Sequence, residues 1–364
     1  MKFKILKSDL YKHISIAQKA ISNKINIQTL ENILFQAKGD ELILSSTDME
    51  LSIETRVKCD VIEEGACLIK STIIGNIINK MPQDEITITV KDDKVNIKSQ
   101  NSVFDIQGQD AEEYPPLPDV EENSILTLDN TILTKAIRET LFATSTDETR
   151  LALTGVLFEI KDKKINFVGL DGYRMAVRTL DCNLDLDVSA IVPKRAFSEL
   201  TKILDDDKTE IVVVEGHIVF INGDTKMYSS LISKNYIDYK KLLNSSYQTS
   251  VKVNRHDLIN SLERAQLLTT GMSSSLTKLQ IHDGVINISS NSEYGSLDED
   301  VFASQEGEDL NIAFNTRYLL EGLKAINEDE VLLHLQNSLS PMNIYPANED
   351  DDYLYLVLPV RLSQ

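Results

Sequence analysis

The strongest constraint on the fold is a pattern that occurs three times along the chain. The first copy opens with an alternating run at Phe3 and Ile5, and continues with Leu10 and Ile14 at helical spacing after the polar pair Ser8-Asp9. Alternation predicts a strand, apolar residues three or four positions apart predict a helix, and small oxygen-bearing side chains favour a helix start. The copies begin 123 and 125 residues apart, and the equivalent residues are Leu126, Leu128, Leu133 and Ile137, then Val251, Val253, Leu258 and Leu262.

A second pattern has the same period and predicts a second helix in each copy. Ile69–Thr72, Val192–Arg195 and Phe314–Arg317 each place polar residues after a strand end, and apolar residues at helical spacing follow them. Short solenoid repeats run roughly 20–50 residues, whereas a period of this size matches a whole domain. The sequence therefore predicts an α+β chain of three repeated domains, each with two helices and antiparallel strands. The expected bounds are 1–123, 124–249 and 250–364.

Three further segments lead to local predictions. The proline-rich stretch Tyr114–Pro118 cannot continue a sheet because proline lacks an N–H, so residues 110–124 are expected to form a linker. The acidic run Asn348–Asp352 lacks the ligand spacing of a calcium loop, so it is expected to be solvated charge. The apolar end of the chain, Tyr353–Leu362, predicts either a last strand of the third domain or one wall of a partner groove.

The charge of the chain is unevenly distributed. A formal net charge of −20 argues against nucleic-acid binding if it is taken alone. The predicted helices, however, hold thirteen basic and six acidic residues, a net charge of +7, which leaves −27 for the rest of the chain. These helices are residues 8–22, 70–81, 130–142, 193–204, 254–267 and 315–326. A solvated helix face would explain any one of these helices, but six basic helices in an acidic protein point to a local surface for an anionic partner.

No motif for catalysis, metal binding or membrane insertion is present. The sequence lacks a GxxxxGK loop, a GxSxG elbow and an HExxH helix, so no enzyme activity and no cofactor are expected. The three cysteines have no CxxC spacing and the five histidines are scattered, so no metal site is expected. An N-terminal signal segment and an apolar run of membrane-spanning length are also missing, so a cytoplasmic protein without membrane contact is expected.

Several of these residues, taken together, resemble the bacterial DNA polymerase III β subunits, the replication sliding clamps. The resemblance covers the whole chain and rests on the threefold repeat and on four motifs: Ser46–Glu50, Gly169–Ala176, Ile237–Tyr239 and Leu358–Leu362. It implies a non-catalytic processivity factor that forms a head-to-tail homodimer and closes a ring around duplex DNA. The implied partners are the DNA polymerase III α subunit, the clamp loader, and other polymerases and repair proteins, which would bind through short peptides.

The resemblance assigns the basic helices to the inner surface of the ring. Lys24 stands where the family has a DNA-contacting arginine, and Lys194-Arg195 match a basic pair of the family. Leu151-Ala152 replace two tyrosines that lie near DNA in some members. The expected DNA-binding residues are Lys12, Lys19, Lys24, Lys70, Lys80, Lys135, Arg138, Lys194, Arg195, Lys202, Arg255, Arg264, Arg317 and Lys324.

The resemblance also implies a groove between the second and third domains for a peptide with a glutamine followed by leucine and phenylalanine. The residues carried over to it are Leu153, Leu170, Gly172, Tyr173, Arg174, Met175, Ile237, Lys241, Leu242, Asn315, Tyr318, Leu339, Pro341, Leu356, Val357, Leu358, Pro359, Val360, Arg361 and Leu362. For Leu153, Met175 and Leu242, plain core packing is an equally good interpretation. Tyr173, Ile237 and Lys241 depart from the His, Pro and Arg that are usual there, so the peptide preference can differ.

The implied dimer interface joins the first domain of one copy to the third domain of the other. Its expected residues are Phe104, Ile106, Leu267, Leu268, Glu299 and Asp300. Phe104 lies in an alternating strand, where a core position is the default interpretation. Two other classes of function remain possible from the sequence: a repeat scaffold that binds only protein, and a hydrolase on a repeated α+β scaffold.

Overall fold

The computed structural model describes residues 1–22, 27–118, 126–243, 246–269, 276–348 and 351–361. Its contacts divide the chain into two compact units. The first contains residues 1–133 and 195–231, and the second contains residues 134–194 and 232–364. Each unit therefore combines one terminal repeat with part of the central repeat, because β-sheets run without interruption from one repeat into the next.

The first unit contains two antiparallel sheets. The five-stranded sheet has the order β5 (Asp60–Glu63), β1 (Lys2–Leu6), β7 (Glu85–Lys91), β8 (Lys94–Ser99) and β9 (Ser102–Gln107). The eight-stranded sheet has the order β10 (Leu126–Asp129), β15 (Lys208–Val214), β16 (His217–Asn222), β17 (Thr225–Ser230), β4 (Leu51–Lys58), β3 (Glu41–Thr47), β2 (Asn32–Lys38) and β6 (Gly65–Lys70). Strands β2 and β3 form a hairpin that turns at Gly39 and Asp40.

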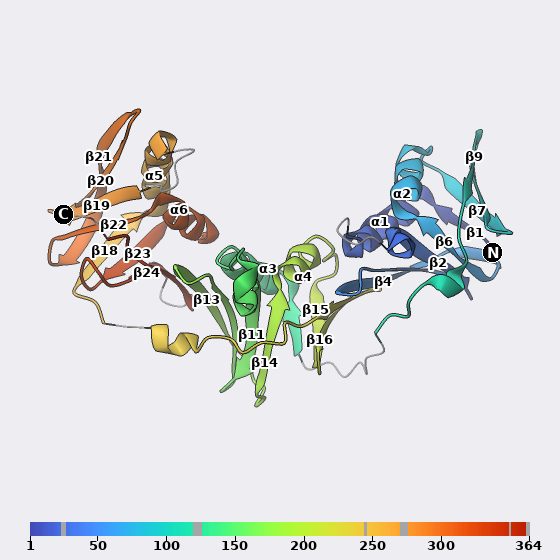
Figure 1. The fold of residues 1–364 in the computed structure, drawn as a ribbon, viewed down its shortest axis with the longest axis horizontal. Coiled ribbons are helices and arrows are strands. Elements are labelled where there is room, and N and C mark those ends of the chain that lie inside the picture. Colours follow the sequence, from blue (N-terminus) through green and yellow to red (C-terminus); the bar gives the residue numbers. More distant parts are fainter. Residues whose placement is uncertain (23–26, 119–125, 244–245, 270–275, 349–350, 362–364) are drawn as a thin grey trace. The chain divides into compact units, whose positions relative to one another are not determined.

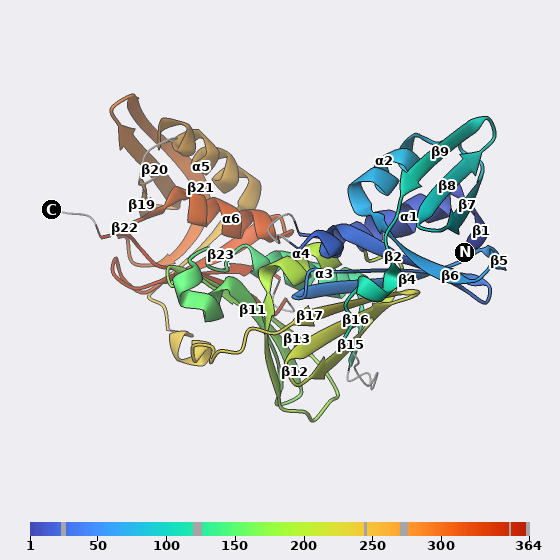
Figure 2. The ribbon, with the colours of Figure 1, turned by 45° about the vertical axis from the view of Figure 1, so that its right-hand side comes forward.

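Helices α1 (Lys7–Ala17) and α2 (Ser71–Lys80) lie side by side in the first unit (Figure 2). The predicted apolar residues Phe3, Leu10 and Ile14 are fully buried there, together with Ile74 of α2. The expected helix start at Ser8-Asp9 is wrong by one to two residues. Helix α1 begins at Lys7 without a side-chain cap, and the Ser8 hydroxyl donates to Asp9 instead.

The second unit contains a sheet of twelve strands. Their order is β14 (Val188–Pro193), β11 (Gly155–Lys161), β12 (Lys164–Leu170), β13 (Arg174–Asp181), β25 (Tyr353–Val357), β24 (Met342–Pro346), β23 (Glu330–Leu335), β18 (Thr249–Asn254), β21 (Gly295–Gly307), β20 (Val285–Ser292), β19 (Leu276–His282) and β22 (Leu310–Asn315). The long strand β21 pairs with β20 along its first half and with β18 along its second half.

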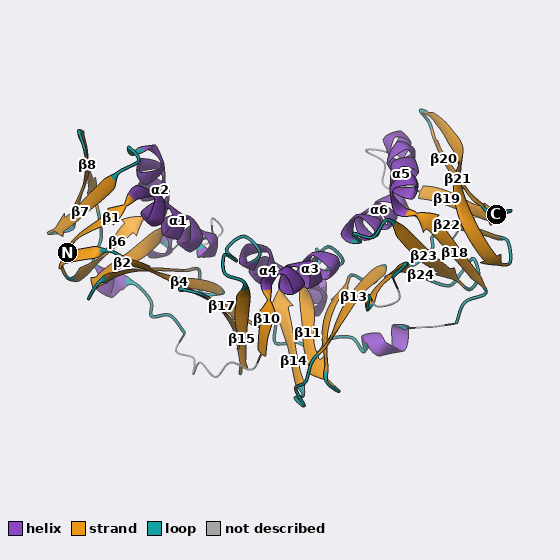
Figure 3. Cartoon of the chain, turned by 180° about the vertical axis from the view of Figure 1, so that it is seen from behind, coloured by secondary structure: helices purple, strands orange, loops and turns teal. Residues whose placement is uncertain are grey.

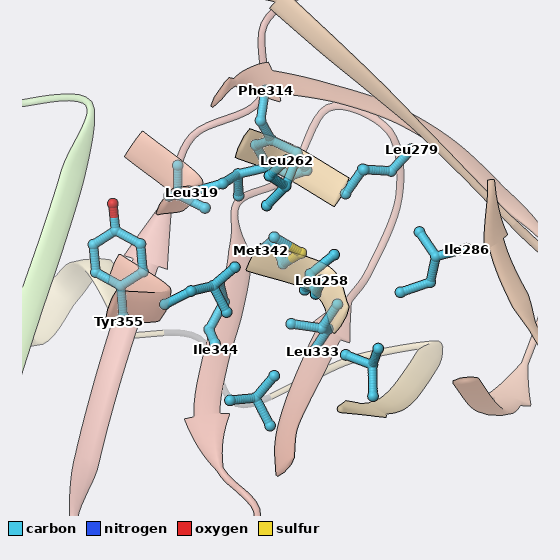
Figure 4. Close-up of a cluster of buried hydrophobic side chains, with 14 of the residues drawn as sticks. Leu258, Leu262, Leu279, Ile286, Phe314, Leu319, Leu333, Met342, Ile344 and Tyr355 are labelled. Atoms are coloured by element: carbon cyan, nitrogen blue, oxygen red, sulfur yellow. The ribbon is translucent and has the colours of Figure 1, made fainter. Parts of the chain in front are cut away.

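The helices of the third repeat, α5 (Arg255–Thr269) and α6 (Thr316–Ala325), pack together on one side of these strands (Figures 1 and 3). Figure 4 shows the core between helices and sheet, where Leu262 and Leu319 meet the strand residues Met342 and Ile344. The central repeat supplies α3 (Asn130–Leu141) and α4 (Lys194–Leu200). All six predicted helices are therefore confirmed, although α1 ends at Ala17 and α4 at Leu200, five and four residues before their expected ends at 22 and 204.

The same strand pairing joins the first repeat to the second and the second to the third. In the first unit β4 pairs with β17, with Ile53 opposite Met227. In the second unit β13 pairs with β25, with Ala176 opposite Tyr355. Strand β25 also pairs with β24, so the apolar end of the chain is both a strand of the third repeat and a partner of the second.

Two local predictions are corrected by packing. The expected linker contains Tyr114, which is buried against Leu30 and Leu68, and its hydroxyl accepts a hydrogen bond from the Thr47 amide. The first half of that segment is therefore part of the first repeat. The prediction of solvated charge is wrong for Asp351, the fourth residue of the acidic run. Its side chain is only 6% exposed because it is paired with two cations, as described below.

No helix among the described residues is long and apolar enough to cross a membrane.

Candidate functional site

Four of the residues expected in the peptide groove lie together in one apolar cluster of the second unit. Leu153, Leu170, Met175 and Leu356 pack with Tyr239 there, so the cluster combines residues of the second and third repeats. Leu153 and Met175 are 4% and 0% exposed, so each of them has a packing role. Leu242, in contrast, is 42% exposed.

Six other residues of the same expected set have exposed apolar side chains. They are Tyr173, Ile237, Leu242, Leu339, Leu358 and Val360. The segment after β25 is held by its backbone: the Leu358 amide donates to the Tyr173 carbonyl, and the Val360 amide donates to the Ala313 carbonyl. Its apolar side chains are therefore free to contact a partner. Leu362 lies outside the described residues.

A tight turn positions Tyr173 at the edge of this surface. Asp171 Oδ1 accepts hydrogen bonds from the backbone amides of Tyr173 and Arg174, which closes a turn after β12. Gly172 has a φ of +95°, and an added Cβ would lie 2.8 Å from an Arg150 nitrogen. The positive φ is the reason that favours glycine there, because the flexible Arg150 side chain could move away from a Cβ.

Arg174 holds the two repeats together beneath this surface. Its guanidinium is buried, donates to Asp171 (3.0 Å) and to the Phe142 carbonyl (2.9 Å), and forms an ion pair with Glu321 of α6. It also lies 4.5 Å from the ring centroid of Tyr318. Because these donors are engaged, Arg174 acts as a structural anchor. Asn315 is likewise engaged, since its side chain accepts from the Arg317 amide as the N-cap of α6.

A polar pocket of about 300 Å³ lies next to this apolar surface and shares three of its expected residues. Tyr173, Arg174 and Tyr318 line it, and the two tyrosine rings stack with centroids 6.2 Å apart. Two residues expected to bind DNA, Lys194 and Arg317, line the same pocket. The remaining lining residues are Phe142, Thr144, Ser145, Thr146, Asp147, Arg150, Asp171 and Glu321. Most of them follow the end of α3, and no sequence motif selects them.

The cations expected to bind DNA differ in their contacts. Six form ion pairs at the surface: Lys12 with Asp205, Lys70 with Glu31, Lys202 with Glu199, Arg264 with Glu299, Arg317 with Glu321, and Lys324 with Glu263. Lys19, Lys80, Arg138 and Lys194 have no ion pair within the ranges that the structure covers. Lys24 lies outside those ranges.

Three of the expected cations are engaged within the protein. Arg255 is buried and donates to the carbonyls of Glu328 and Leu323, so the structure does not support it as a DNA contact. Arg195 forms an ion pair with Asp48 and donates to the Lys19 and Ala20 carbonyls. Lys135 donates to Asp351 at 2.8 Å.

Lys135 belongs to a buried ion cluster of the second unit. Arg178 on β13 contacts Glu139 at 2.6 Å and also pairs with Asp351. Burial raises the pKa of Glu139. Burial alone would also raise the pKa of Asp351, but hydrogen bonds from Arg178 and Lys135 outweigh it and hold that pKa below its usual value. The cluster ties α3 and β13 of the second repeat to the third repeat.

The residues expected at the dimer interface differ in position and burial: Phe104 and Ile106 lie on β9, Leu267 and Leu268 on α5, and Glu299 and Asp300 on β21, and Ile106 packs partly against the core of the first unit. Phe104 is 41% exposed on β9, which is the last strand of its sheet. A core position for Phe104 is therefore excluded within this chain. Leu267 is 76% exposed, and Glu299 pairs with Arg264 on the first half of β21.

Within the described part of the chain, no group of three or more His, Cys, Asp or Glu side chains could hold a metal ion.

Comparison with known proteins agrees with this architecture. Three family models for the DNA polymerase III β subunit match the chain in order: the N-terminal domain over residues 1–118, the central domain over 127–238, and the C-terminal domain over 240–361. The chain belongs to the DNA polymerase III β-subunit family. Members of this family are sliding clamps, which are non-catalytic processivity factors of DNA polymerases, and this function is confirmed for the chain, as is its three-domain α+β fold.

Individual sliding clamps are similar over their full length. The β sliding clamp of Bacillus subtilis is 31% identical over 377 residues, which cover 99% of this chain and 100% of that protein. The crystal structure of the Bacillus subtilis clamp has a TM-score of 0.96 at 30% identity, with all of both chains covered. A Pseudomonas aeruginosa clamp bound to griselimycin has a TM-score of 0.95 at 26% identity, also over both whole chains.

Proposed function

We propose that two copies of this chain close head to tail into a ring around duplex DNA and tether polymerases to it. The observation that supports this most directly is the strand pairing that recurs between repeats, β4 with β17 and β13 with β25. With domains at 1–123, 124–249 and 250–364, the first and the third domain each keep one strand edge of the kind that pairs between neighbouring repeats. Within the described residues, neither of these two edges has a partner strand from another repeat of the same chain. A contact between two different surfaces generates a ring when its rotation closes.

The repeat predicts which strands meet between copies. The strand pairings show which strands hold the same position in the three repeats. Strand β9 holds the position of β17 and β25, and the first half of β21 holds the position of β4 and β13. Phe104 corresponds to Met227 and Tyr355, while Leu297 corresponds to Ile53 and Ala176. We therefore place Phe104 opposite Leu297 of a second copy, which would cover the exposed apolar edge of β9.

The unpaired cations supply the contact with DNA. Lys19, Lys80 and Arg138 lie on or beside the helices, have no ion pair in the described part of the chain, and are available to phosphates. Phosphate contacts carry no sequence information, so weak attraction of this kind permits sliding. A closed ring holds DNA by its topology and does not need tight binding.

The apolar cluster and its exposed rim form the proposed peptide site. A short peptide with leucine and phenylalanine would place these side chains over Leu153, Met175 and Leu356. The proposed partners are the DNA polymerase III α subunit, the clamp loader, other DNA polymerases and repair proteins, all in the cytoplasm.

The ring is tested by its retention on DNA of different topology. After loading onto a nicked circular plasmid, the protein should co-elute with the DNA on gel filtration, and it should be lost when a restriction enzyme linearises the circle. Equal retention on the two forms would contradict the ring.

The DNA-contacting role of the helices is tested with a charge-matched pair of variants. The double variant Lys80→Gln and Arg138→Gln should weaken binding to short duplexes and reduce the slope of log affinity against log salt by about 2. The control Lys38→Gln and Lys58→Gln removes the same charge from exposed strand residues. If the two double variants weakened binding equally, the effect would come from the net charge of the protein alone. That result would refute the assignment of Lys80 and Arg138 as DNA contacts.

A further inference from the structure

The polar pocket beside the peptide site contains more cations than anions, although the protein as a whole is strongly acidic. Four cationic residues line it, Arg150, Arg174, Lys194 and Arg317, against the acids Asp147, Asp171 and Glu321. The net charge of the chain is −20, so a positive pocket runs against the overall balance. Such a local excess favours an anionic ligand group.

The three acids of the pocket are already engaged. Asp147 accepts from Thr149 and Arg150, and Asp171 accepts from Arg174. Glu321 is shared between Arg174 and Arg317. No lining carboxylate is left as a dedicated partner for the fourth cation.

Lys194 is that fourth cation. It is half-buried, and within the described residues it has no ion pair or hydrogen bond through its side chain. Burial lowers the pKa of Lys194, the neighbouring Arg174 and Arg317 lower it further, and the charge of Glu321 offsets these effects only in part. A partly desolvated ammonium that has no carboxylate of its own is unfavourable, so a carboxylate that enters the pocket would compensate both the desolvation and the repulsion.

The position of the pocket indicates where this carboxylate comes from. Tyr173, Arg174 and Tyr318 line the pocket and also belong to the proposed peptide site. The leucine and phenylalanine of a partner peptide would occupy the apolar cluster. With the motif glutamine over Tyr173 and Tyr318, the residues before it would enter the polar pocket.

We infer that this pocket selects partner peptides that carry an aspartate or glutamate on the N-terminal side of the glutamine, with Lys194 as the counter-charge. The inference rests on the proposed peptide site. A peptide carboxylate fits better than a DNA strand, because a strand carries a charge at every phosphate and would bring further phosphates toward Asp147 and Glu321.

The test compares two fluorescent peptides that differ only in a Glu or a Gln immediately before the motif glutamine. Fluorescence anisotropy with the full-length protein should give about fivefold tighter binding of the Glu peptide at low salt, and this preference should shrink as salt is added. The variant Lys194→Gln should bind the two peptides equally. The control Lys58→Gln, with the same change in net charge, should keep the preference.

The outcomes separate this inference from the function on which it rests. No preference in the unmodified protein, or a preference that survives in Lys194→Gln, would overturn the carboxylate pocket. If Lys194→Gln keeps the peptide preference but loses retention on circular DNA, the pocket contacts phosphate and the inference is wrong. Failure of both peptides to bind the unmodified protein would refute the peptide site itself. Deleting residues 358–364 should abolish the binding of both.

Discussion

At the scale of single residues, the buried arginines of this chain differ from the exposed Arg138 in how their donors are used. Arg174, Arg178 and Arg255 are at most 9% exposed, and their donors are used for carboxylates and carbonyls of neighbouring elements. Arg138 is exposed and has no ion pair among the described residues. A buried guanidinium needs all of its partners inside the protein, so only the exposed kind is available to a ligand.

Asp351 provides a test of this buried network. Replacing Asp351 by Asn removes one partner of Arg178 and of Lys135 and should lower the free energy of unfolding by about 2 kcal/mol at neutral pH. The pKa of Asp351 is depressed in the folded state, so its stabilisation is present above its unfolded pKa and is lost as pH falls through the folded one. The difference in the free energy of unfolding between the variant and the unmodified protein should therefore be largest near pH 7 and should vanish in acid. Urea unfolding at several pH values measures this difference.

The neighbouring residue is the matched control. The side chain of Asp352 is 59% exposed and reaches Lys164 only at 3.9 Å. Replacing Asp352 by Asn should change stability by less than roughly 0.5 kcal/mol at any of these pH values. Equal losses for the two variants would show that Asp351 is not the buried partner described above.

At the scale of elements, helix α6 approaches strand β25 closely at Gly322. An added Cβ at Gly322 would lie 2.1 to 2.7 Å from atoms of the Tyr355 ring. That ring is fully buried, and its hydroxyl donates to the Tyr318 carbonyl at 2.8 Å. The glycine lets the helix approach the strand that carries the apolar end of the chain.

Gly322→Ala should destabilise the protein. In an exposed helix, Gly→Ala stabilises by up to about 1 kcal/mol, but overpacking against the Tyr355 ring should reverse the sign and cost about 1–3 kcal/mol. Thermal unfolding followed by circular dichroism measures this. Gly75→Ala in α2 is the comparison, because the Cβ of the new alanine would meet only the flexible Gln18 amide. The loss of stability should therefore be smaller than for Gly322→Ala. A stabilised Gly322→Ala variant would contradict this packing.

At the scale of the whole molecule, the proposed dimer depends on the register of β9 against β21. With Phe104 opposite Leu297, Val103 faces Asp298 of the second copy. Directly opposed residues in antiparallel strands have the Cα separation that a disulfide needs, whereas residues two positions out of register do not.

The double variant Val103→Cys and Asp298→Cys should therefore form a covalent dimer when it is oxidised. Non-reducing gel electrophoresis should show the dimer in high yield, and a reductant should reverse it. The control Val103→Cys and Asp300→Cys keeps one cysteine and shifts the other by two residues, so it should cross-link poorly. A high yield in the control, or none in the first variant, would refute the register. The single variants show whether the native Cys59, Cys67 or Cys182 contribute.

The sequence by itself determined the repeat and the six helices, because the apolar residues of one helix face are only three or four positions apart. It also pointed to the family through contiguous motifs such as Gly169–Ala176. These signals are local, so they survive without knowledge of the fold.

Only the tertiary structure decided which charges are paired and where the two expected sites meet. Arg178 and Asp351 are 173 residues apart in sequence, so no local pattern could identify their contact, and the acidic run was expected to be solvated. Lys194 and Arg317, expected on the DNA side, line one pocket with Tyr173 of the peptide site. Long-range pairing depends on which strands and helices become neighbours, and a one-dimensional spacing does not contain that information.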